Sequence, residues 1–213
     1  MIFADRLDAA RRLATALDAC RGHDPLILAI PRGAVPMGAA LATELGGDLD
    51  VVLVHKLGAP GNPEYAVGAI DESGWSFVSD ALAADEAWLR RERAYRLDEL
   101  RRRRALYSPE RPAVDPHGRI AIVVDDGLAT GATMLAALHA LRARDPARLI
   151  CAVPVAAPDS LERVRRHADE IVCLHAPPNF NAVGQFYARF DQVGDDEVIA
   201  CLRRFRPAAP AKR

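Results

Sequence analysis

The chain has 213 residues, half of them hydrophobic, and a formal net charge of −1 at pH 7. This length and hydrophobic content predict a single α/β domain, and the near-neutral charge argues against a dedicated nucleic-acid binder. The sequence contains no run of eighteen apolar residues, no signal-peptide pattern and no C-x-x-C pair among its four cysteines, so we expect a cytoplasmic protein without a membrane partner.

The N-terminal part predicts a helix, a short buried strand, a polar loop and a second helix, over residues 5–20, 26–30, 31–36 and 37–45. The first helix has its apolar residues on one face, and its charged face is expected to be solvated. In the loop, Arg32 offers a fork of donors that matches phosphate oxygens, and Gly33 lets a ligand approach the backbone closely. A plain turn is the alternative for Pro-Arg-Gly.

A second strand is predicted over residues 50–54, with His55 and Lys56 directly at its carboxyl end. A lysine beside a polar loop suits an anionic ligand, although an exposed loop lysine is the alternative. The next segment predicts a turn-rich, mobile loop and then a hairpin with a tight turn, over residues 58–63, 66–70, 71–74 and 76–78.

The longest helical pattern covers residues 80–107 and includes the block Arg101–Arg104. Four consecutive helical residues point to all sides of a helix, so this block does not form one patch. We therefore favour a solvated helix over a nucleic-acid-binding one. Prolines at three of the following positions predict a loop: Pro109, Pro112 and Pro116.

Residues 120–133 combine a strand, a tight loop and the start of a helix that runs to residue 144. The five apolar residues Ile120–Val124 predict a strand buried on both faces. At its carboxyl end, Asp125 and Asp126 can accept hydrogen bonds from vicinal sugar hydroxyls, or hold a magnesium ion through water. A simple turn is the alternative for Asp-Asp-Gly.

The rest of this loop suits a phosphate group. A helix N-terminus exposes backbone N–H groups, Thr130 and Thr133 add hydroxyl donors, and Gly131 permits close approach. One loop therefore offers a phosphate cradle beside a diol clamp, and a ribose 5-phosphate carries both groups at about that separation. A helix cap is the alternative for the threonines, and the glycine patterns of the P-loop and of dinucleotide-binding folds do not occur.

The segment Val123–Thr133 resembles the phosphoribosyl-pyrophosphate (PRPP) signature of type I phosphoribosyltransferases. The resemblance implies that Asp125 and Asp126 hold the ribose hydroxyls and contribute to catalysis by stabilising a developing positive ribose. It also implies that the remaining loop residues bind the ribose and its 5-phosphate: Gly127, Ala129, Thr130, Gly131, Ala132 and Thr133.

The same resemblance gives roles to the earlier loops. It implies that the pyrophosphate of PRPP is bound by Arg32, Gly33 and Ala34. From its position beside the two loops, Lys56 is expected to be a further pyrophosphate contact with a catalytic role. Residues 55–107 would supply a hairpin, a lid and the long helix. An alternative to the solvated helix is that one of its arginines swings over the diphosphate when the lid closes.

The C-terminal half predicts two further strands and a helix between them, over residues 148–153, 170–174 and 159–167. Asp159 or Ser160 is expected to cap that helix. The alternation of strands and helices predicts a mostly parallel sheet flanked by helices. All three polar loops would then lie at the carboxyl edge of the sheet, where ligands bind in such folds.

Residues 177–190 are dense in aromatic side chains. The run from Phe180 to Tyr187 resembles a Phe-x-Ala-Val-Gly-x-Tyr pattern in the C-terminal hood of a bacterial branch of this family. Phe180 and Tyr187 are therefore candidates for stacking on an acceptor base, with core packing as the alternative. The hood, its short helix and an expected disordered tail cover residues 175–205, 195–204 and 206–213.

The resemblance as a whole implies one phosphoribosyltransferase-like domain over residues 1–213 that uses PRPP and Mg²⁺. The implied reaction transfers a 5-phosphoribosyl group to a nitrogen acceptor, a base, and releases pyrophosphate. A regulator that senses PRPP or a nucleotide is an alternative on the same fold, and an interaction protein that uses the arginine-rich helix is a third. The acceptor and the oligomeric state stay open, a homodimer included.

Overall fold

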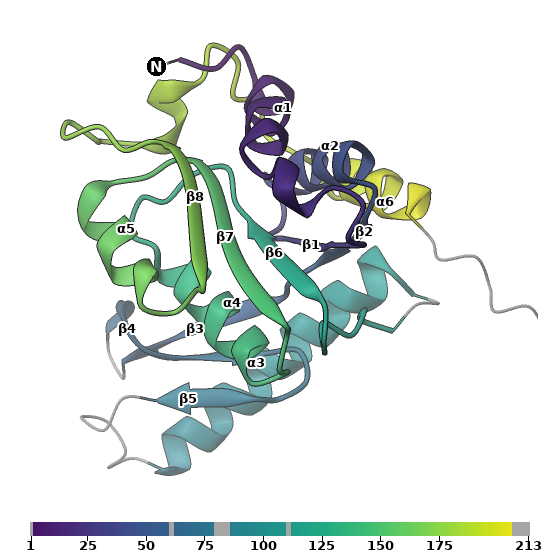
Figure 1. The fold of residues 1–213 in the computed structure, drawn as a ribbon. Helices are drawn as coiled ribbons and strands as arrows, with labels where there is room; N and C mark the ends of the chain where they lie inside the picture. Colours follow the sequence, from purple (N-terminus) through teal and green to yellow (C-terminus); the bar gives the residue numbers. More distant parts are fainter. Residues whose placement is uncertain (1, 60–61, 79–85, 110–111, 206–213) are drawn as a thin grey trace, which may run out of the picture.

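The computed structural model describes residues 2–59, 62–78, 86–109 and 112–205 (Figure 1). The predicted tail lies outside these residues, as do the first residues of the predicted long helix and the tip of the predicted loop 58–63. In chain order the elements are α1 (Arg6–Ala16), η1 (Asp18–Cys20), β1 (Leu26–Ala29), α2 (Val35–Leu45), β2 (Asp48–Val51), β3 (Val54–Ala59), β4 (Asn62–Asp71), β5 (Ser76–Val78), α3 (Glu86–Tyr107), β6 (Ile120–Val124), α4 (Ala132–Arg142), β7 (Arg148–Val155), α5 (Pro158–Arg165), β8 (Glu170–His175), η3 (Val183–Phe186) and α6 (Asp195–Arg204).

Five parallel strands form the central sheet in the order β2-β1-β6-β7-β8. Alternate residues of a strand point to opposite faces, so each strand feeds two cores. In β6, Ile122 and Val124 enter the core shared with α1, α2 and α6, whereas Ala121 and Val123 enter the core shared with α4 and α5. Burial on both faces explains the unbroken apolar runs, and the predicted α/β fold is confirmed.

Helices cover both faces of this sheet (Figure 1). The helices α1 and α2 pack together on one face with α6 beside α2, and α4 lies on the other face against β6 and β7. None of the helices in the described parts of the chain combines the length and apolarity needed to cross a membrane.

A second, antiparallel sheet has the order β3-β4-β5 and packs against α4 and α3. The predicted hairpin across residues 71–74 is confirmed. The predicted single strand 50–54 is wrong, because β2 ends at Val51 and β3 of the second sheet begins at Val54. Residues 51–54 are uniformly apolar, so their pattern does not mark where the chain leaves the first sheet.

This correction changes the position of Lys56, which lies within β3 and not at the carboxyl end of a strand of the main sheet. The predicted loop 58–63 is also largely wrong, because β3 runs to Ala59 and β4 begins at Asn62. The two residues between those strands lie outside the described part of the chain.

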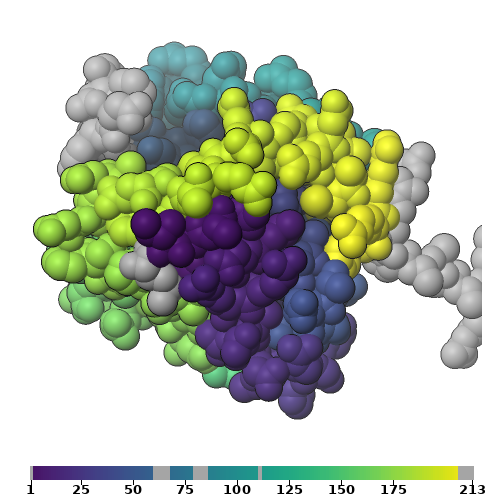
Figure 2. Space-filling model, turned by 90° about the horizontal axis from the view of Figure 1, so that it is seen from above, coloured from purple at the N-terminus to yellow at the C-terminus, as the bar shows by residue number. Residues whose placement is uncertain are grey.

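The two ends of the described chain pack together. Phe3 N donates to Phe186 O at 2.8 Å, and Ala188 N donates to Phe3 O at 2.8 Å. Figure 2 shows the purple N-terminal segment directly beside the yellow-green C-terminal segment. Phe3 is completely buried in this contact. The hood therefore contains N-terminal residues in addition to residues 175–205.

Candidate functional site

The candidate site lies where the loops after β1 and β6 diverge. These strands are neighbours, and Ile30 N still donates to Val124 O at 3.0 Å where both strands end. From β1 the chain continues to β2 on one side, while β6 lies on the other side and leads toward β7. Such a switch in strand order opens a crevice at the carboxyl edge of a sheet, where ligands bind.

The two loops touch through a glycine. A Cβ atom on Gly33 would lie 2.2 Å from the Asp126 carboxylate oxygen Oδ2, so only glycine fits where the first loop crosses the second. The peptide bond between Pro31 and Arg32 is cis. Ala34 is the N-cap residue of α2 and is completely buried, and its carbonyl accepts from Gly38 N at 2.8 Å, so it has no surface to offer a ligand in this conformation. The loops predicted to bind pyrophosphate and ribose are thus in contact.

Asp126 already has a cationic partner within the protein. The Arg6 guanidinium donates to Asp126 Oδ2 from Nε at 3.0 Å and from Nη2 at 2.9 Å. Its third nitrogen donates to Asp191 O at 2.6 Å, and its carbon lies 3.9 Å from the centroid of the Phe190 ring. The expectation that the charged face of the first helix is only solvated is wrong for Arg6. Sequence reasoning missed this contact because 120 positions separate the two residues.

Asp125 has a different environment. Burial raises the pKa of Asp125 well above its ordinary value of 3.8, and the adjacent charge of Asp126 raises it further. Burial also raises the pKa of Asp126, but the Arg6 guanidinium opposes that effect. Among the described residues no ion pair involves Asp125, and its Oδ1 accepts only a hydrogen bond from Asp126 N at 2.9 Å. The charge of Arg6 opposes the raised pKa of Asp125 only in part, so Asp125 is the carboxylate without an ion-pair partner among the described residues.

The loop between Gly127 and Gly131 is held from behind by α5. Ser160 Oγ donates to Ala129 O at 2.6 Å, and Arg163 Nη2 donates to Thr130 O at 3.1 Å. These contacts, together with a hydrogen bond from Leu128 N to Val155 O at 2.9 Å, fix the path of the loop. The prediction that Asp159 or Ser160 caps α5 is wrong, because the N-cap residue is Ala157 and Ser160 is buried under the loop.

The end of this loop has the form expected for a phosphate cradle. Gly131 adopts φ 72°, which favours glycine, and it is the N-cap residue of α4. Ala132 and Thr133 follow in the first turn, whose N–H groups have no partner inside the helix. Gly127 has a packing role, since a Cβ there would lie 2.7 Å from Val183 Cγ1 of the hood.

Lys56 meets the two loops in a cavity of about 230 Å³. Pro31, Thr133 and Arg103 also line this cavity, although Lys56 lies in the second sheet. Lys56 is half-buried, and it takes part in no ion pair among the described residues. The predicted proximity of Lys56 to both loops therefore agrees with the structure, even though the strand assignment was wrong.

Arg32 faces a neighbouring cavity of about 490 Å³, which shares Pro31 and Arg103 with the first. Its Nη1 lies 3.9 Å from Asp195 Oδ1 at the start of α6. The Tyr107 hydroxyl donates to the same carboxylate oxygen at 2.8 Å. Burial and this carboxylate raise the pKa of Tyr107 to about 12. Arg32 is thus near the Lys56 cavity but oriented toward α6.

The hood aromatics divide into buried and exposed rings. Tyr187 is 6% exposed, and its hydroxyl donates to Asp126 O at 2.7 Å. This geometry favours the core-packing alternative for Tyr187. Phe180 is half-buried against Phe186, with ring centroids 5.3 Å apart. Phe190, one of the aromatic residues of the predicted hood, is 37% exposed and stacks on Tyr187.

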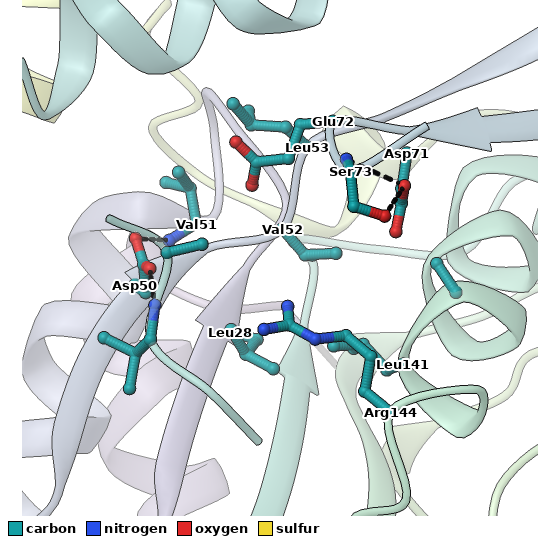
Figure 3. Close-up of a pocket in the computed structure, with 13 residues that line it drawn as sticks. Leu28, Asp50, Val51, Val52, Leu53, Asp71, Glu72, Ser73, Leu141 and Arg144 are labelled. Carbon is teal, nitrogen blue, oxygen red and sulfur yellow. Dashed lines mark hydrogen bonds between the residues drawn. The ribbon is translucent and has the colours of Figure 1, made fainter. Parts of the chain in front are cut away.

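A third cavity, of about 350 Å³, lies elsewhere (Figure 3). Its carboxylates are engaged within the protein: Asp50 accepts from Val51 N at 2.8 Å and Asp71 accepts from Ser73 N at 2.9 Å. Arg144 reaches into this cavity just beyond the C-terminal end of α4, whereas the candidate site is at the N-terminal end. At 1.5 Å per residue the two ends of α4 are about 16 Å apart. The cavity adjoins the Lys56 cavity through Val52 and Leu53, but no residue of the two loops lines it.

Comparison with known proteins gives consistent matches. A family model described as phosphoribosyl transferase domain matches residues 2–191. Two curated Mycobacterium tuberculosis proteins, from strains H37Rv and CDC 1551, are provisionally named phosphoribosyl transferases. They are 42% identical to this chain over 207 residues, which is 95% of this chain and 47% of each relative. The chain thus spans about half the length of the curated relatives it matches.

A solved structure matches over the full fold. The crystal structure of the protein TT1426 from Thermus thermophilus has a TM-score of 0.90 and 44% sequence identity to this chain. The match covers 97% of this chain and 100% of the other.

Proposed function

Because this chain belongs to the phosphoribosyl transferase family, we propose that it transfers a 5-phosphoribosyl group from PRPP to a nitrogen acceptor and releases pyrophosphate. One observation carries this proposal. The loop containing Gly33 lies directly against Asp126, so a polar loop suited to a diphosphate adjoins the carboxylates and the helix N-terminus of the second loop. A sugar with a phosphate at one end and a diphosphate at the other matches this order of groups.

The two carboxylates would have different roles in binding the ribose. Asp126 Oδ2 already accepts two hydrogen bonds from Arg6, which fixes the side chain and compensates its charge. Asp125 lacks such a partner and would gain most from accepting hydrogen bonds from ribose hydroxyls. Once bound, both negative charges would lie beside the sugar and stabilise positive charge that develops at C1.

The phosphate groups would bind to donors on either side of the ribose. The N–H groups between Ala129 and Thr133, with the hydroxyls of Thr130 and Thr133, would hold the 5-phosphate. Lys56, Arg32 and the backbone at Gly33 would hold the pyrophosphate. Lys56 is half-buried and has no carboxylate partner among the described residues. Partial removal of its charge from water costs free energy, and a bound anion would offset that cost.

The reaction would be a displacement at C1 of the ribose. The acceptor nitrogen forms a bond to C1, the C1–O bond to the diphosphate breaks, and the diphosphate leaves with that electron pair while the acceptor loses its proton. The side chains described above would act by positioning and by charge stabilisation, without a covalent intermediate. Cations at the diphosphate would stabilise the leaving group as its charge increases.

The donor set fits a magnesium ion held mainly by the substrate. Within the described residues there is no cluster of three or more histidine, cysteine, aspartate or glutamate side chains that could form a metal cage. Mg²⁺ commonly binds through one or two carboxylates, waters and substrate phosphates, so Asp125 and Asp126 suffice as protein partners. When bound, the ion would neutralise phosphate charge and rigidify PRPP.

The acceptor would bind on the hood side of the ribose. Phe180 is half-buried and Phe190 is partly exposed, so both rings have surface for a flat acceptor. Tyr187 would support the site from beneath, because its hydroxyl already holds the backbone of Asp126. A base is the acceptor class that such rings favour.

The proposal can be tested by measuring PRPP binding calorimetrically with and without Mg²⁺, followed by assays for pyrophosphate release with a panel of purine and pyrimidine bases. We expect magnesium-dependent PRPP binding and release of one pyrophosphate per base consumed. The absence of PRPP binding in the presence of Mg²⁺ would reject the function. Binding without turnover on any base would favour a PRPP-sensing regulator.

A further inference from the structure

The four arginines of the block Arg101–Arg104 have different surroundings. Arg104 is largely buried, where it donates to Glu72 Oε2 at 2.6 Å and to Asp50 Oδ1 at 2.7 Å. Arg102 pairs with Asp98 along the helix at 2.8 Å. Arg101 is exposed and lines a surface cavity with Arg104 and Ser108. The block is therefore not one patch, because Arg101 and Arg104 line one cavity whereas Arg102 and Arg103 line another.

Arg102 and Arg103 both line the cavity of Arg32. Of the four arginines, only Arg103 also lines the cavity of Lys56 and Thr133. Its helix is fixed nearby, because Tyr107 is buried and donates to Asp195, and Arg104 ties α3 to the turn of the second sheet. Arg103 therefore lines the cavity without any swing of a lid.

No described carboxylate neutralises Arg103. None of the ion pairs within the described ranges includes it. Two acids line the Arg32 cavity, but Glu99 is held by Arg96 at 2.7 Å and Asp195 accepts from Tyr107 at 2.8 Å. Lys56 likewise has no carboxylate partner among the described residues. Two uncompensated cations lining one cavity repel each other, and an anion bound between them relieves this repulsion.

We propose that Arg103 is a further pyrophosphate-binding residue, which acts together with Lys56 in the cavity that both residues line. The inference rests on the proposed function. A guanidinium can donate two parallel hydrogen bonds to phosphate oxygens, whereas the Lys56 ammonium acts as a point charge. The pair therefore combines directional recognition with charge compensation at the group that leaves in the reaction.

The test compares Arg103→Ala with the matched variant Arg101→Ala, which removes an exposed arginine two residues earlier on the same helix. Affinities for PRPP, inorganic pyrophosphate and ribose 5-phosphate are measured calorimetrically with Mg²⁺, together with the melting temperature. For Arg103→Ala we expect a roughly tenfold loss of affinity for PRPP and pyrophosphate, typical of one charged hydrogen-bonding group. Ribose 5-phosphate affinity and the melting temperature should stay unchanged, as should every value for Arg101→Ala.

Four results would overturn the inference. Equal affinities in Arg103→Ala and the wild type, with the wild type binding PRPP, reject Arg103 while the proposed function stands. Equal losses in both alanine variants indicate a general effect of helix charge and also reject it, as does an equal loss for ribose 5-phosphate. If the wild type binds neither PRPP nor pyrophosphate, both the inference and the proposed function are rejected. Partial recovery in Arg103→Lys would support the proposal.

Discussion

The two halves of the candidate site are built in opposite ways. In the acidic half, Arg6 compensates Asp126, Tyr187 holds the Asp126 carbonyl, and Gly33 packs against the carboxylate. In the cationic half, Lys56 and Arg103 line a cavity and form no ion pair among the described residues. The comparison indicates that the acidic half keeps its shape without a ligand, whereas the cationic half reaches charge balance only with one.

This difference predicts where substitutions act. Changes to the supports of the acidic half should alter the free energy of unfolding, because those groups have partners inside the protein. Changes in the cationic half should alter ligand affinity and leave the fold nearly unaffected. Asp125 is the exception in the acidic half, since burial raises its pKa and it lacks a cationic partner among the described residues.

The largest expected effect is that of Asp125→Asn on PRPP affinity. Loss of two charge-assisted hydrogen bonds to ribose hydroxyls should cost about 3 kcal/mol, or roughly a hundredfold in affinity, measured calorimetrically. The same variant should melt at a higher temperature at neutral pH, because the buried carboxylate is disfavoured when ionised. An affinity within about twofold of the wild type would show that the acidic pair is only a turn.

The sign of the stability effect follows from the raised pKa. The folded protein binds a proton at Asp125 more tightly than the unfolded chain, so the free energy of unfolding falls as pH rises above 3.8 toward the folded pKa. Asp169 provides a matched control of opposite sign. Burial raises the pKa of Asp169, but hydrogen bonds from Arg142 and Leu149 N outweigh it and lower the pKa. Asp169→Asn should therefore lose stability at neutral pH.

The next effect is that of Arg6→Ala on stability. The side chains of Arg6 and Asp126 are 13% and 16% exposed, so removal of the guanidinium leaves a largely buried carboxylate without compensation. We expect a loss of about 2 kcal/mol in denaturant unfolding, and weaker PRPP binding. Arg189→Ala is the control, because Arg189 pairs with Asp5 at the surface and is 72% exposed. A similar loss in both variants would contradict a special role for Arg6.

A smaller effect is expected for Lys56→Ala. It should weaken PRPP binding roughly tenfold while affinity for ribose 5-phosphate and the unfolding midpoint stay constant. Arg32→Ala should act in the same direction, with a smaller change because Arg32 lies 3.9 Å from Asp195. Titration of both ligands into each variant separates the subsites. Equal losses of affinity for PRPP and ribose 5-phosphate would contradict the assignment of Lys56 and Arg32 to the diphosphate.

The smallest effects concern the hood. Tyr187→Phe removes the hydrogen bond to Asp126 O and should lower the free energy of unfolding by about 1 kcal/mol without changing acceptor choice. Phe180→Leu should instead alter the acceptor KM at constant PRPP affinity. If Phe180→Leu changes only the melting temperature, the half-buried ring has a packing role. The hood would then support the site without determining which acceptor binds.

The sequence predicted the main sheet well because its central strands β1, β6 and β7 are buried on both faces. The apolar run before Asp125 and the glycines around Thr130 also indicated the correct loop and the correct start of α4. These features are local, since a strand, a turn and a helix N-terminus each leave a pattern in consecutive residues.

The features that the sequence did not reveal depend on distant residues. Arg6 looks like any charged residue on an amphipathic helix until Asp126 is placed beside it. Serine is a residue type that often caps helices, but the Ser160 hydroxyl donates its hydrogen bond to the Ala129 carbonyl of the loop. The start of β3 lies inside an apolar run, so Lys56 was placed at the right site for an incorrect structural reason.

The contact between the two ends of the chain has a consequence for biosynthesis. Phe3 is buried against residues near 186–188, and Arg6 contacts Asp126 and Asp191. A ribosome releases the N-terminal residues first, so Phe3 must stay without these partners until the hood has emerged. The acidic half would therefore be the last part of the site to form. Nascent chains stalled before residue 183 should leave Phe3 accessible to protease, whereas release of the full chain should protect it.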